Sequence, residues 1–373
     1  MSYYGENNLF SFRDNFCEQK ENTMISSSEL ANFGCTTNFN AKRIAIGFGS
    51  ENLRGLAYAL AGGISDNGTE VVMTDICAMP SFSFCVCAYL CNIGIYLSGC
   101  NVTVLHFFDE YGMPLNKSSM LGIMNSKSSP VLKNSAKISS FINNDVLYLN
   151  KIFDSFGHSF LPLDVSCGNK DVLKLWHEVF TSSNSTANDI VLSVSDNGMR
   201  VSAYSRDFGF ISHQRLILAL AVRLMKNNIV VALPETFHFG ANFIGEKYNG
   251  KLIRFGENSN KLSKLASEQR FTFDCLALCA SIFNENFSAS EIFGDIPELF
   301  TAVREFSPQN PAIIAETSFI DRNNLISVSR SGKNRFALSV QSRQAETAAE
   351  LCGIWQNKLS QLSVFTKNFP PEK

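Results

Sequence analysis

The chain has 373 residues, of which 45% are hydrophobic and 18% are charged, and its formal net charge is -2. This length and apolar content suffice for two to four compact domains with buried cores. Because the lysines and arginines are scattered and nearly balanced by acids, the basic field of nucleic-acid-binding proteins is excluded, and we expect no nucleic-acid partner.

The N-terminal residues, the length of the apolar runs and the cysteines indicate the cellular compartment. No charged-then-apolar signal opens the chain, and no run reaches the roughly 18 to 20 apolar residues of a membrane helix. We therefore expect a cytoplasmic protein with no membrane partner. An odd number of cysteines, 11, does not suit a disulfide framework, and their apolar surroundings are typical of buried, reduced thiols. Cys85, Cys87 and Cys91 have no histidine nearby and do not share a helix face, so we expect core thiols rather than a metal site.

The first elements follow from composition and period. Residues 1–40 are rich in Asn, Ser, Glu and Phe without a sustained period, which predicts a loosely ordered lead-in with one short helix near 28–32. The segments that follow predict a strand, an amphipathic helix, a second strand and a second helix, at residues 42–48, 53–67, 70–75 and 83–90.

The stretch 91–115 reads CNIGIYLSGCNVTVLHFFDEYGMPL and is the first candidate site. One apolar run brings Ser98, Gly99 and Cys100 into a turn, and a second run leaves it at 104–108. A glycine beside a nucleophile at such a junction lets the side chain project while backbone N–H groups point at an anion.

The rest of the chain alternates between strand-like patterns, with a period of two residues, and helix-like patterns, with a period of about 3.6 residues. After a polar run, residues 138–149 predict a helix. Strand patterns follow at 160–166, 189–195, 201–204, 229–233 and 252–255, and helix patterns at 171–180, 213–225, 236–248 and 259–269. The last region predicts strands at 325–329 and 336–339 and a helix at 346–359, with a cationic turn between the strands. This alternation predicts an α/β protein.

In their order along residues 42–362, these segments resemble the α-D-phosphohexomutases, the superfamily of phosphomannomutase, phosphoglucomutase and phosphoglucosamine mutase. Residues 94–103 resemble the family's phosphoserine loop, G-I-x-I-T-A-S-H-N-P, and residues 110–115 its D-G-x-P-L turn. The resemblance implies three α/β domains with mixed sheets and a smaller α+β C-terminal domain around a central cleft. The implied bounds are a lead-in at 1–40 and domains at 41–150, 151–228, 229–305 and 306–373.

The resemblance also locates the family's functional positions, many of which differ here. Cys100 takes the phosphoserine position and Asn101 the histidine position. The three magnesium aspartates of D-G-D-x-D-R correspond to Ser195, Asn197 and Met199, and the arginine is kept as Arg200. Because magnesium requires several hard oxygen ligands and a thioether is not one, we expect no magnesium and no other cofactor.

The family's phosphate clamp, R-x-S-G-T-E-P-x-x-R, resembles the cationic turn, with the Glu-Pro pair deleted. The matching residues are Arg330, Ser331, Gly332, Lys333 and Arg335. Backbone N–H groups and cations in such a turn can hold a sugar phosphate or another anion, and the alternative is a solvated basic turn. The family's sugar loop, G-E-x-S-G-H, has no counterpart.

These losses favour a catalytically inactive homologue, a pseudoenzyme whose fold binds an anion or a protein partner. Losing one preorganised electrostatic group already costs about 10²- to 10³-fold in rate. Two alternatives stay open. One is an active mutase or phosphatase-like phosphotransferase in which Cys100 forms a phosphocysteine, assisted by Arg200, Arg335 and Mg²⁺. The other is a redox or structural role for the cysteine-rich first domain.

Overall fold

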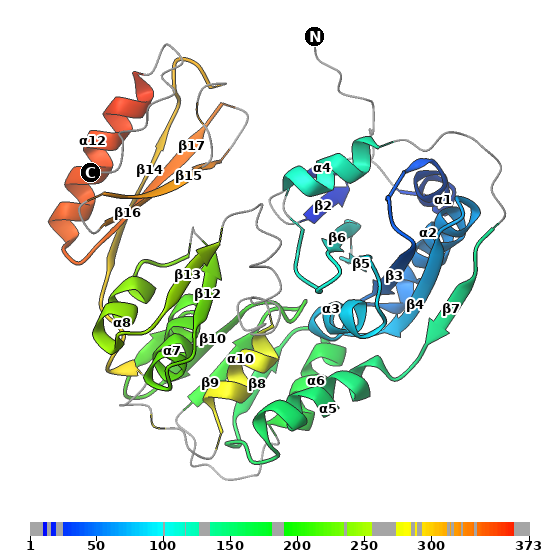
Figure 1. The fold of residues 1–373 in the computed structure, drawn as a ribbon, viewed down its shortest axis with the longest axis horizontal. Coiled ribbons are helices and arrows are strands. Elements are labelled where there is room, and N and C mark those ends of the chain that lie inside the picture. The colour runs from blue at the N-terminus through cyan, green and yellow to red at the C-terminus, as the bar shows by residue number, and fades with distance from the viewer. Residues whose placement is uncertain are drawn as a thin grey trace. The chain divides into compact units, whose positions relative to one another are not determined.

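The computed structural model describes residues 10–12, 16–19, 25–99, 101–115, 117–126, 135–180, 190–234, 237–255, 274–284, 288, 293–311, 314, 317–321, 324–331 and 334–361 (Figure 1). The chain divides into two compact units. The first unit comprises residues 1–216 and 259–287, and the second comprises residues 217–258 and 288–373. The finer division into four domains stays a prediction.

A seven-stranded mixed sheet, in the order β1-β2-β6-β5-β3-β4-β7, forms the framework of the first unit. Its strands are Phe10–Phe12 (β1), Phe16–Gln19 (β2), Arg43–Phe48 (β3), Glu70–Ile76 (β4), Ile93–Ser98 (β5), Val104–Phe108 (β6) and Ile138–Phe141 (β7). Strand β3 runs parallel to β4 and β5, whereas β2 and β5 run antiparallel to β6. The predicted strand-helix-strand unit at 42–75 is confirmed.

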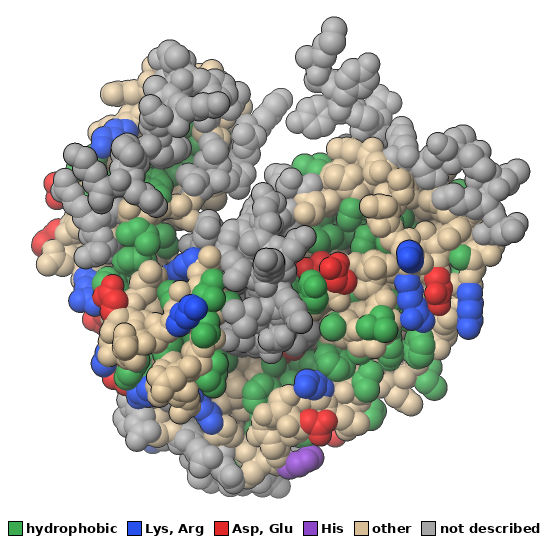
Figure 2. All heavy atoms as spheres, in the orientation of Figure 1, with side chains coloured by type: hydrophobic (Ala, Val, Ile, Leu, Met, Phe, Trp, Pro, Cys, Tyr) green, Lys and Arg blue, Asp and Glu red, His purple; other side chains and the backbone are tan. Residues whose placement is uncertain are grey.

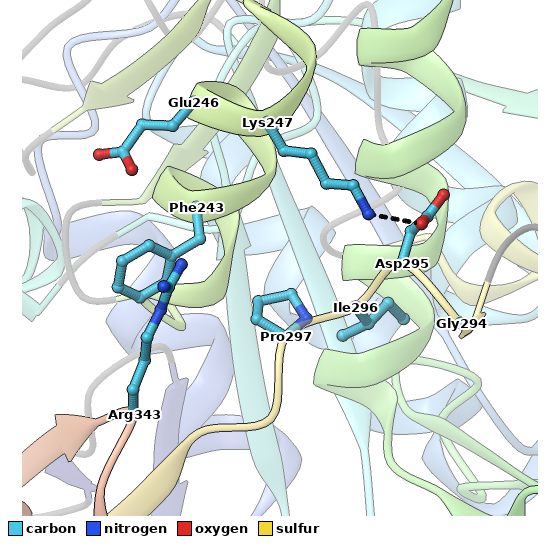
Figure 3. Close-up of a pocket in the computed structure, with 8 residues that line it drawn as sticks. All are labelled: Phe243, Glu246, Lys247, Gly294, Asp295, Ile296, Pro297 and Arg343. Carbon is cyan, nitrogen blue, oxygen red and sulfur yellow. Dashed lines mark hydrogen bonds and ion pairs between the residues drawn. The ribbon is translucent and has the colours of Figure 1, made fainter.

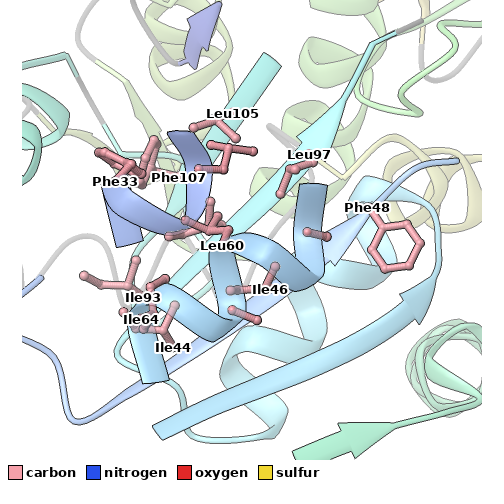
Figure 4. Close-up of a cluster of buried hydrophobic side chains, with 14 of the residues drawn as sticks. Phe33, Ile44, Ile46, Phe48, Leu60, Ile64, Ile93, Leu97, Leu105 and Phe107 are labelled. Atoms are coloured by element: carbon pink, nitrogen blue, oxygen red, sulfur yellow. The ribbon is translucent and has the colours of Figure 1, made fainter. Parts of the chain in front are cut away.

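Helices cover both faces of this sheet. They are Ser27–Thr36 (α1), Arg54–Asp66 (α2), Met79–Ala88 (α3) and Lys117–Asn125 (α4), and Asn144–Phe156 (α5) packs against α3. Alternate residues of β3 face opposite sides, as the pleat requires. Ile44 and Ile46 pack in the cluster with α1 and α2 (Figure 4), whereas Ala45 packs in the cluster with α3. Phe107 and Phe108 of β6 are buried core residues.

The short helix expected near 28–32 is confirmed as α1, whereas three other expectations about this unit are wrong. The lead-in also contains the strands β1 and β2, because pairing with β6 supplies the order that local sequence does not indicate. The helix expected at 138–149 is the strand β7 followed by α5, since pairing with β4 overrides the local pattern. The helix expected at 83–90 begins earlier, at Met79, because Pro80 suits a first helical turn.

A second sheet of the first unit has the order β11-β10-β9-β8. Its strands are Asp164–Cys167 (β8), Ile190–Val194 (β9), Val201–Ser205 (β10) and Gly209–Ile211 (β11), so the strand expected at 160–166 begins later, at Asp164. The helices Lys170–Val179 (α6) and Cys275–Ile282 (α10) belong to this region, and His213–Lys226 (α7) begins here. Asp274 caps α10 by accepting from the Ala277 N–H at 3.0 Å, and it also accepts from the Tyr148 hydroxyl of α5.

The second unit holds two further sheets. Val231–Pro234 (β12) pairs in parallel with Leu252–Phe255 (β13), and Gly240–Tyr248 (α8) connects them; the helix expected at 236–248 therefore begins later. The other sheet, in the order β14-β17-β16-β15, contains Phe300–Phe306, Phe336–Ser342, Asn324–Arg330 and Thr317–Asp321, respectively. Ala345–Ser360 (α12) packs on it around Trp355 and Leu359. The helix expected at 259–269 lies outside the described residues.

Ten cysteines lie in the described part of the chain, and all of them are free thiols. Burial raises the pKa of Cys17 to about 12 and that of Cys91 to about 11. Cys85 is buried and Cys87 is exposed, which confirms that they face apart. Buried thiols with raised pKa values react slowly, whereas Cys35 and Cys87 are exposed, so the redox alternative stays a hypothesis. Among the residues described, no helix is long and apolar enough to cross a membrane.

Candidate functional site

The turn between β5 and β6 carries the position predicted for the nucleophile. Gly99 has a φ of 105°, and a Cβ atom there would lie 1.9 Å from the carbonyl oxygen of Val102. Glycine is therefore required, because any side chain would clash with the backbone. Asn101 is exposed in the turn, and Cys100 lies outside the described residues.

Hydrogen bonds between the neighbouring strands fix the position of this turn. A hydrogen bond of 2.8 Å joins Ser98 Oγ to His106 Nε2 across the two strands. Burial lowers the pKa of His106 to about 4, so the imidazole is uncharged at neutral pH. On the other side, the Gln19 N–H donates to the Thr103 carbonyl at 2.9 Å, and Gln19 Oε1 accepts from the Thr103 N–H at 3.2 Å. Sequence reasoning did not find His106, because it looks like any other residue of an alternating strand.

The β9–β10 loop carries the positions of the family's magnesium aspartates, and its polar groups bond to one another. Ser195 Oγ donates to Asn197 Oδ1 at 2.8 Å and accepts from the Arg200 N–H at 3.0 Å. Asn197 Oδ1 also accepts from the Met199 N–H at 3.1 Å. The Gly198 N–H donates to the Ser195 carbonyl at 2.8 Å. The loop is therefore closed by its own hydrogen bonds.

Two residues of this loop, Gly198 and Met199, face the core. Met199 packs against the apolar cluster that contains Phe82 and Tyr96. Gly198, with a φ of 73°, lies so close to the start of α3 that an added Cβ would be 3.3 Å from Pro80. Arg200, in contrast, is exposed. The predicted arginine is thus kept at the surface beside a loop that is anchored to the core.

The residues of this loop do not fit a magnesium ion. The Met199 thioether is too soft a ligand, and both the Ser195 hydroxyl and the Asn197 amide oxygen are engaged within the loop. The exposed Asp196 is the single carboxylate between residues 195 and 200. Throughout the described ranges, no group of three His, Cys, Asp or Glu side chains could hold a metal ion.

The cationic turn joins β16 to β17 in the second unit. The Ser331 N–H donates to the Arg335 carbonyl at 3.0 Å, and both residues are exposed. Arg330 ends β16, but its side chain, like Gly332 and Lys333, lies outside the described part. The hairpin brings Ser331 and Arg335 together, and phosphate binding there stays a prediction.

The sequence matches no protein-family model and no curated protein. Solved structures do match it. A phosphoglucomutase/phosphomannomutase family protein from Burkholderia thailandensis has a TM-score of 0.67 at 11% identity, with 93% of this chain and 96% of that chain covered. A putative phosphomannomutase from Thermus thermophilus has a TM-score of 0.57 at 12% identity, with 94% and 98% covered. The open form of pp63/parafusin, a phosphoglucomutase from Paramecium, has a TM-score of 0.51 at 10% identity, with 92% and 93% covered.

The chain has the phosphohexomutase fold. The resemblance read from the ordered motifs is therefore confirmed at the level of fold, over nearly the whole chain. At identities of 10 to 12%, the likeness carries the fold alone, and the activities named for those proteins remain theirs.

One feature of this phosphohexomutase fold was not predicted. A cavity of about 540 Å³ lies in the second unit between α8, residues 294–297 and Arg343, which directly follows β17 (Figure 3). No sequence signal indicated it, because the lining segments lie about 50 residues apart and share no motif. On the face drawn in Figure 2, basic and acidic side chains are interspersed.

Proposed function

We propose that this chain is a catalytically inactive protein of the phosphohexomutase fold that binds a sugar phosphate or another anion. The observation that carries the proposal is the self-bonded β9–β10 loop. Phosphoryl transfer requires a nucleophile, neutralisation of the phosphoryl charge and groups that orient the substrate. In this loop the groups that would hold a cation are bonded to each other or packed on the core.

The cationic turn supports the binding half of the proposal. Arg335 is exposed and, within the described residues, its guanidinium has no ion-pair partner. Its carbonyl accepts from the Ser331 N–H, which fixes the base of the turn. An exposed guanidinium on a fixed turn can form charge-assisted hydrogen bonds with a phosphate.

A mutase assay tests the proposed lack of catalytic activity. Glucose, mannose and glucosamine phosphates are supplied with Mg²⁺ and a bisphosphate activator, and no turnover above background is expected. The Cys100→Ser variant restores the family's serine, and we expect it to stay inactive because the β9–β10 loop is unchanged. Robust turnover by the natural chain that disappears in Cys100→Ala would overturn the proposal in favour of a phosphocysteine mutase.

Calorimetric titration with Mg²⁺ tests the loop directly. The natural chain is expected to give no saturable heat. The double variant Ser195→Asp/Asn197→Asp places two carboxylates beside Asp196, and we expect it to gain affinity for Mg²⁺. Equal affinity in both proteins would contradict the assignment of the loop as unfit for the metal.

Anion binding is tested by titration with mannose 6-phosphate. Replacing Arg335 by Gln removes the charge-assisted bonds, and we expect affinity to fall about tenfold. The matched control is Lys151→Gln, which removes an exposed cation from α5 in the first unit. An equal loss in both variants would indicate attraction by net charge and not a site at the turn.

A further inference from the structure

We propose that the cavity beside α8 binds a small organic anion through Arg343. This site is separate from the cationic turn, because Ser331–Arg335 precedes β17 and Arg343 follows it. The seven residues of an extended strand, Phe336–Ser342, separate the two positions, and they span roughly 20 Å. The inference therefore does not rest on sugar-phosphate binding at the turn.

The guanidinium of Arg343 is held ready for a ligand. It stacks on the ring of Phe243, with its central carbon 3.7 Å from the ring centroid. Phe243 is only 8% exposed and packs with Phe239 and Leu325. Within the described residues, Arg343 has no hydrogen bond or ion pair to an acceptor. A stacked guanidinium keeps the N–H groups of its edge available for a planar or tetrahedral oxyanion.

The other cation of the cavity is already neutralised. Lys247 Nζ bonds to Asp295 Oδ1 at 2.6 Å, and Lys226 Nζ lies 2.7 Å from Asp295 Oδ2. The Tyr248 hydroxyl also donates to Asp295, and these partners, Lys226 first, hold the pKa of Asp295 well below its ordinary value. Figure 3 shows Lys247 turned toward Asp295 and away from Arg343. Arg343 is therefore the cation that this cavity offers to an incoming anion.

The walls are formed before any ligand arrives. The three bonds to Asp295 hold residues 294–297 against α7 and α8. The Phe239 N–H donates to Gln341 Oε1 at 2.8 Å, which ties the start of α8 to β17 near Arg343. A preformed site loses less conformational entropy on binding than a site that must be ordered by its ligand.

The other residues that line the cavity indicate the chemistry of the rest of the ligand. Ile296 and Pro297 are partly exposed and offer apolar surface, so the body of the ligand is apolar. Glu246 adds an exposed carboxylate at the rim, which disfavours a ligand with a second negative group. A volume of about 540 Å³ suits a molecule of the size of a substituted ring. The ligand class is a small anion that joins one carboxylate or phosphate to an apolar body.

Titration calorimetry on the full chain tests this site with benzoate and phenyl phosphate as probes. We expect saturable binding of at least one probe, and the tighter of the two identifies the oxyanion. Arg343→Gln is expected to weaken binding at least tenfold. Arg343→Lys is expected to weaken it as well, because an ammonium group keeps the charge but loses the fork and the stacking.

Controls separate this site from the turn and from misfolding. Lys151→Gln is expected to bind the probes as the natural chain does, and the melting temperature of Arg343→Gln shows whether the variant is folded. Phe243→Leu keeps an apolar wall but removes the stacking face, so a folded Phe243→Leu variant should also bind more weakly. The proposal is overturned by an absence of saturation with both probes, by unchanged affinity in Arg343→Gln, or by a loss confined to Arg335→Gln.

Discussion

The β9–β10 loop of the first unit and the Arg343 cavity of the second unit differ in whether their polar side chains are already hydrogen-bonded. In the loop, Ser195 and Asn197 bond to each other and to the backbone, and Met199 packs on the core. In the cavity, the side chains of Arg343 and Glu246 have no hydrogen-bonding partner among the described residues. Polar groups that satisfy one another stabilise the fold, whereas charges without partners are available to a ligand. Both of the proposed binding sites, the cationic turn and the Arg343 cavity, lie in the second unit.

The largest expected effect is a loss of stability at low pH, which depends on the buried imidazole of His106 in the first unit. Burial lowers the folded-state pKa of His106 from 6.5 to about 4. Below pH 6.5 the unfolded chain takes up a proton that the folded chain refuses, so stability falls as pH falls from 6.5 to about 4. The loss amounts to about 3 kcal/mol, because one pKa unit corresponds to roughly 1.4 kcal/mol.

Urea unfolding of the natural chain and of His106→Gln, measured across this pH range, checks the prediction. Their difference isolates His106 from other titrating groups, such as Asp109, whose pKa burial raises to about 6. The stability advantage of the natural chain should shrink as the pH is lowered. A difference that does not vary with pH would mean that His106 titrates normally in the folded state.

Met199→Asp is expected to have the next largest effect. It restores a family aspartate but places a charge against the cluster of Phe82 and Tyr96. We expect the free energy of unfolding to fall by about 2 kcal/mol, as measured by urea denaturation. Met199→Leu conserves volume and polarity and should cost less than about 1 kcal/mol. If both variants were equally stable, Met199 would not be anchored to the core.

Ser195→Ala should have a smaller effect. The variant removes the donor to Asn197 Oδ1 and the acceptor for the Arg200 N–H. We expect a loss of about 1 kcal/mol in the free energy of unfolding. Ser193→Ala, on an exposed position of β9, is the matched control and should change stability little. Equal stability of the two variants would show that water replaces the bonds of the loop at no cost.

Asp295→Asn is expected to have the smallest effect on stability. Its partners Lys226 and Lys247 are largely solvated, and exposed ion pairs contribute about 0.5 kcal/mol. The same variant releases Lys247 into the cavity and should strengthen the binding of phenyl phosphate. A melting temperature lowered by many degrees would show instead that Asp295 is a main support of the second unit.

Much of the fold could be predicted because local patterns agreed with the tertiary structure. The alternation along β9 and the amphipathic period of α12 each place one apolar face on a core. Where non-local pairing decided the outcome, prediction failed. Residues 138–141 form a strand because they pair in parallel with β4, and residues 16–19 form one because they pair antiparallel with β6. Neither partner is visible in the local sequence.

For the candidate sites, too, some properties could be predicted from residue identity and others depend on the tertiary structure. The sequence by itself determined that carboxylates are missing at Ser195, Asn197 and Met199, because ligand chemistry depends on residue type. Only the tertiary structure decided that these side chains close a loop on itself, and that Arg343 stacks on Phe243 from 100 residues away. Residue identity sets which bonds a group can form. Folding sets which groups meet, because hydrogen bonds and stacking require contact between segments that are far apart along the chain.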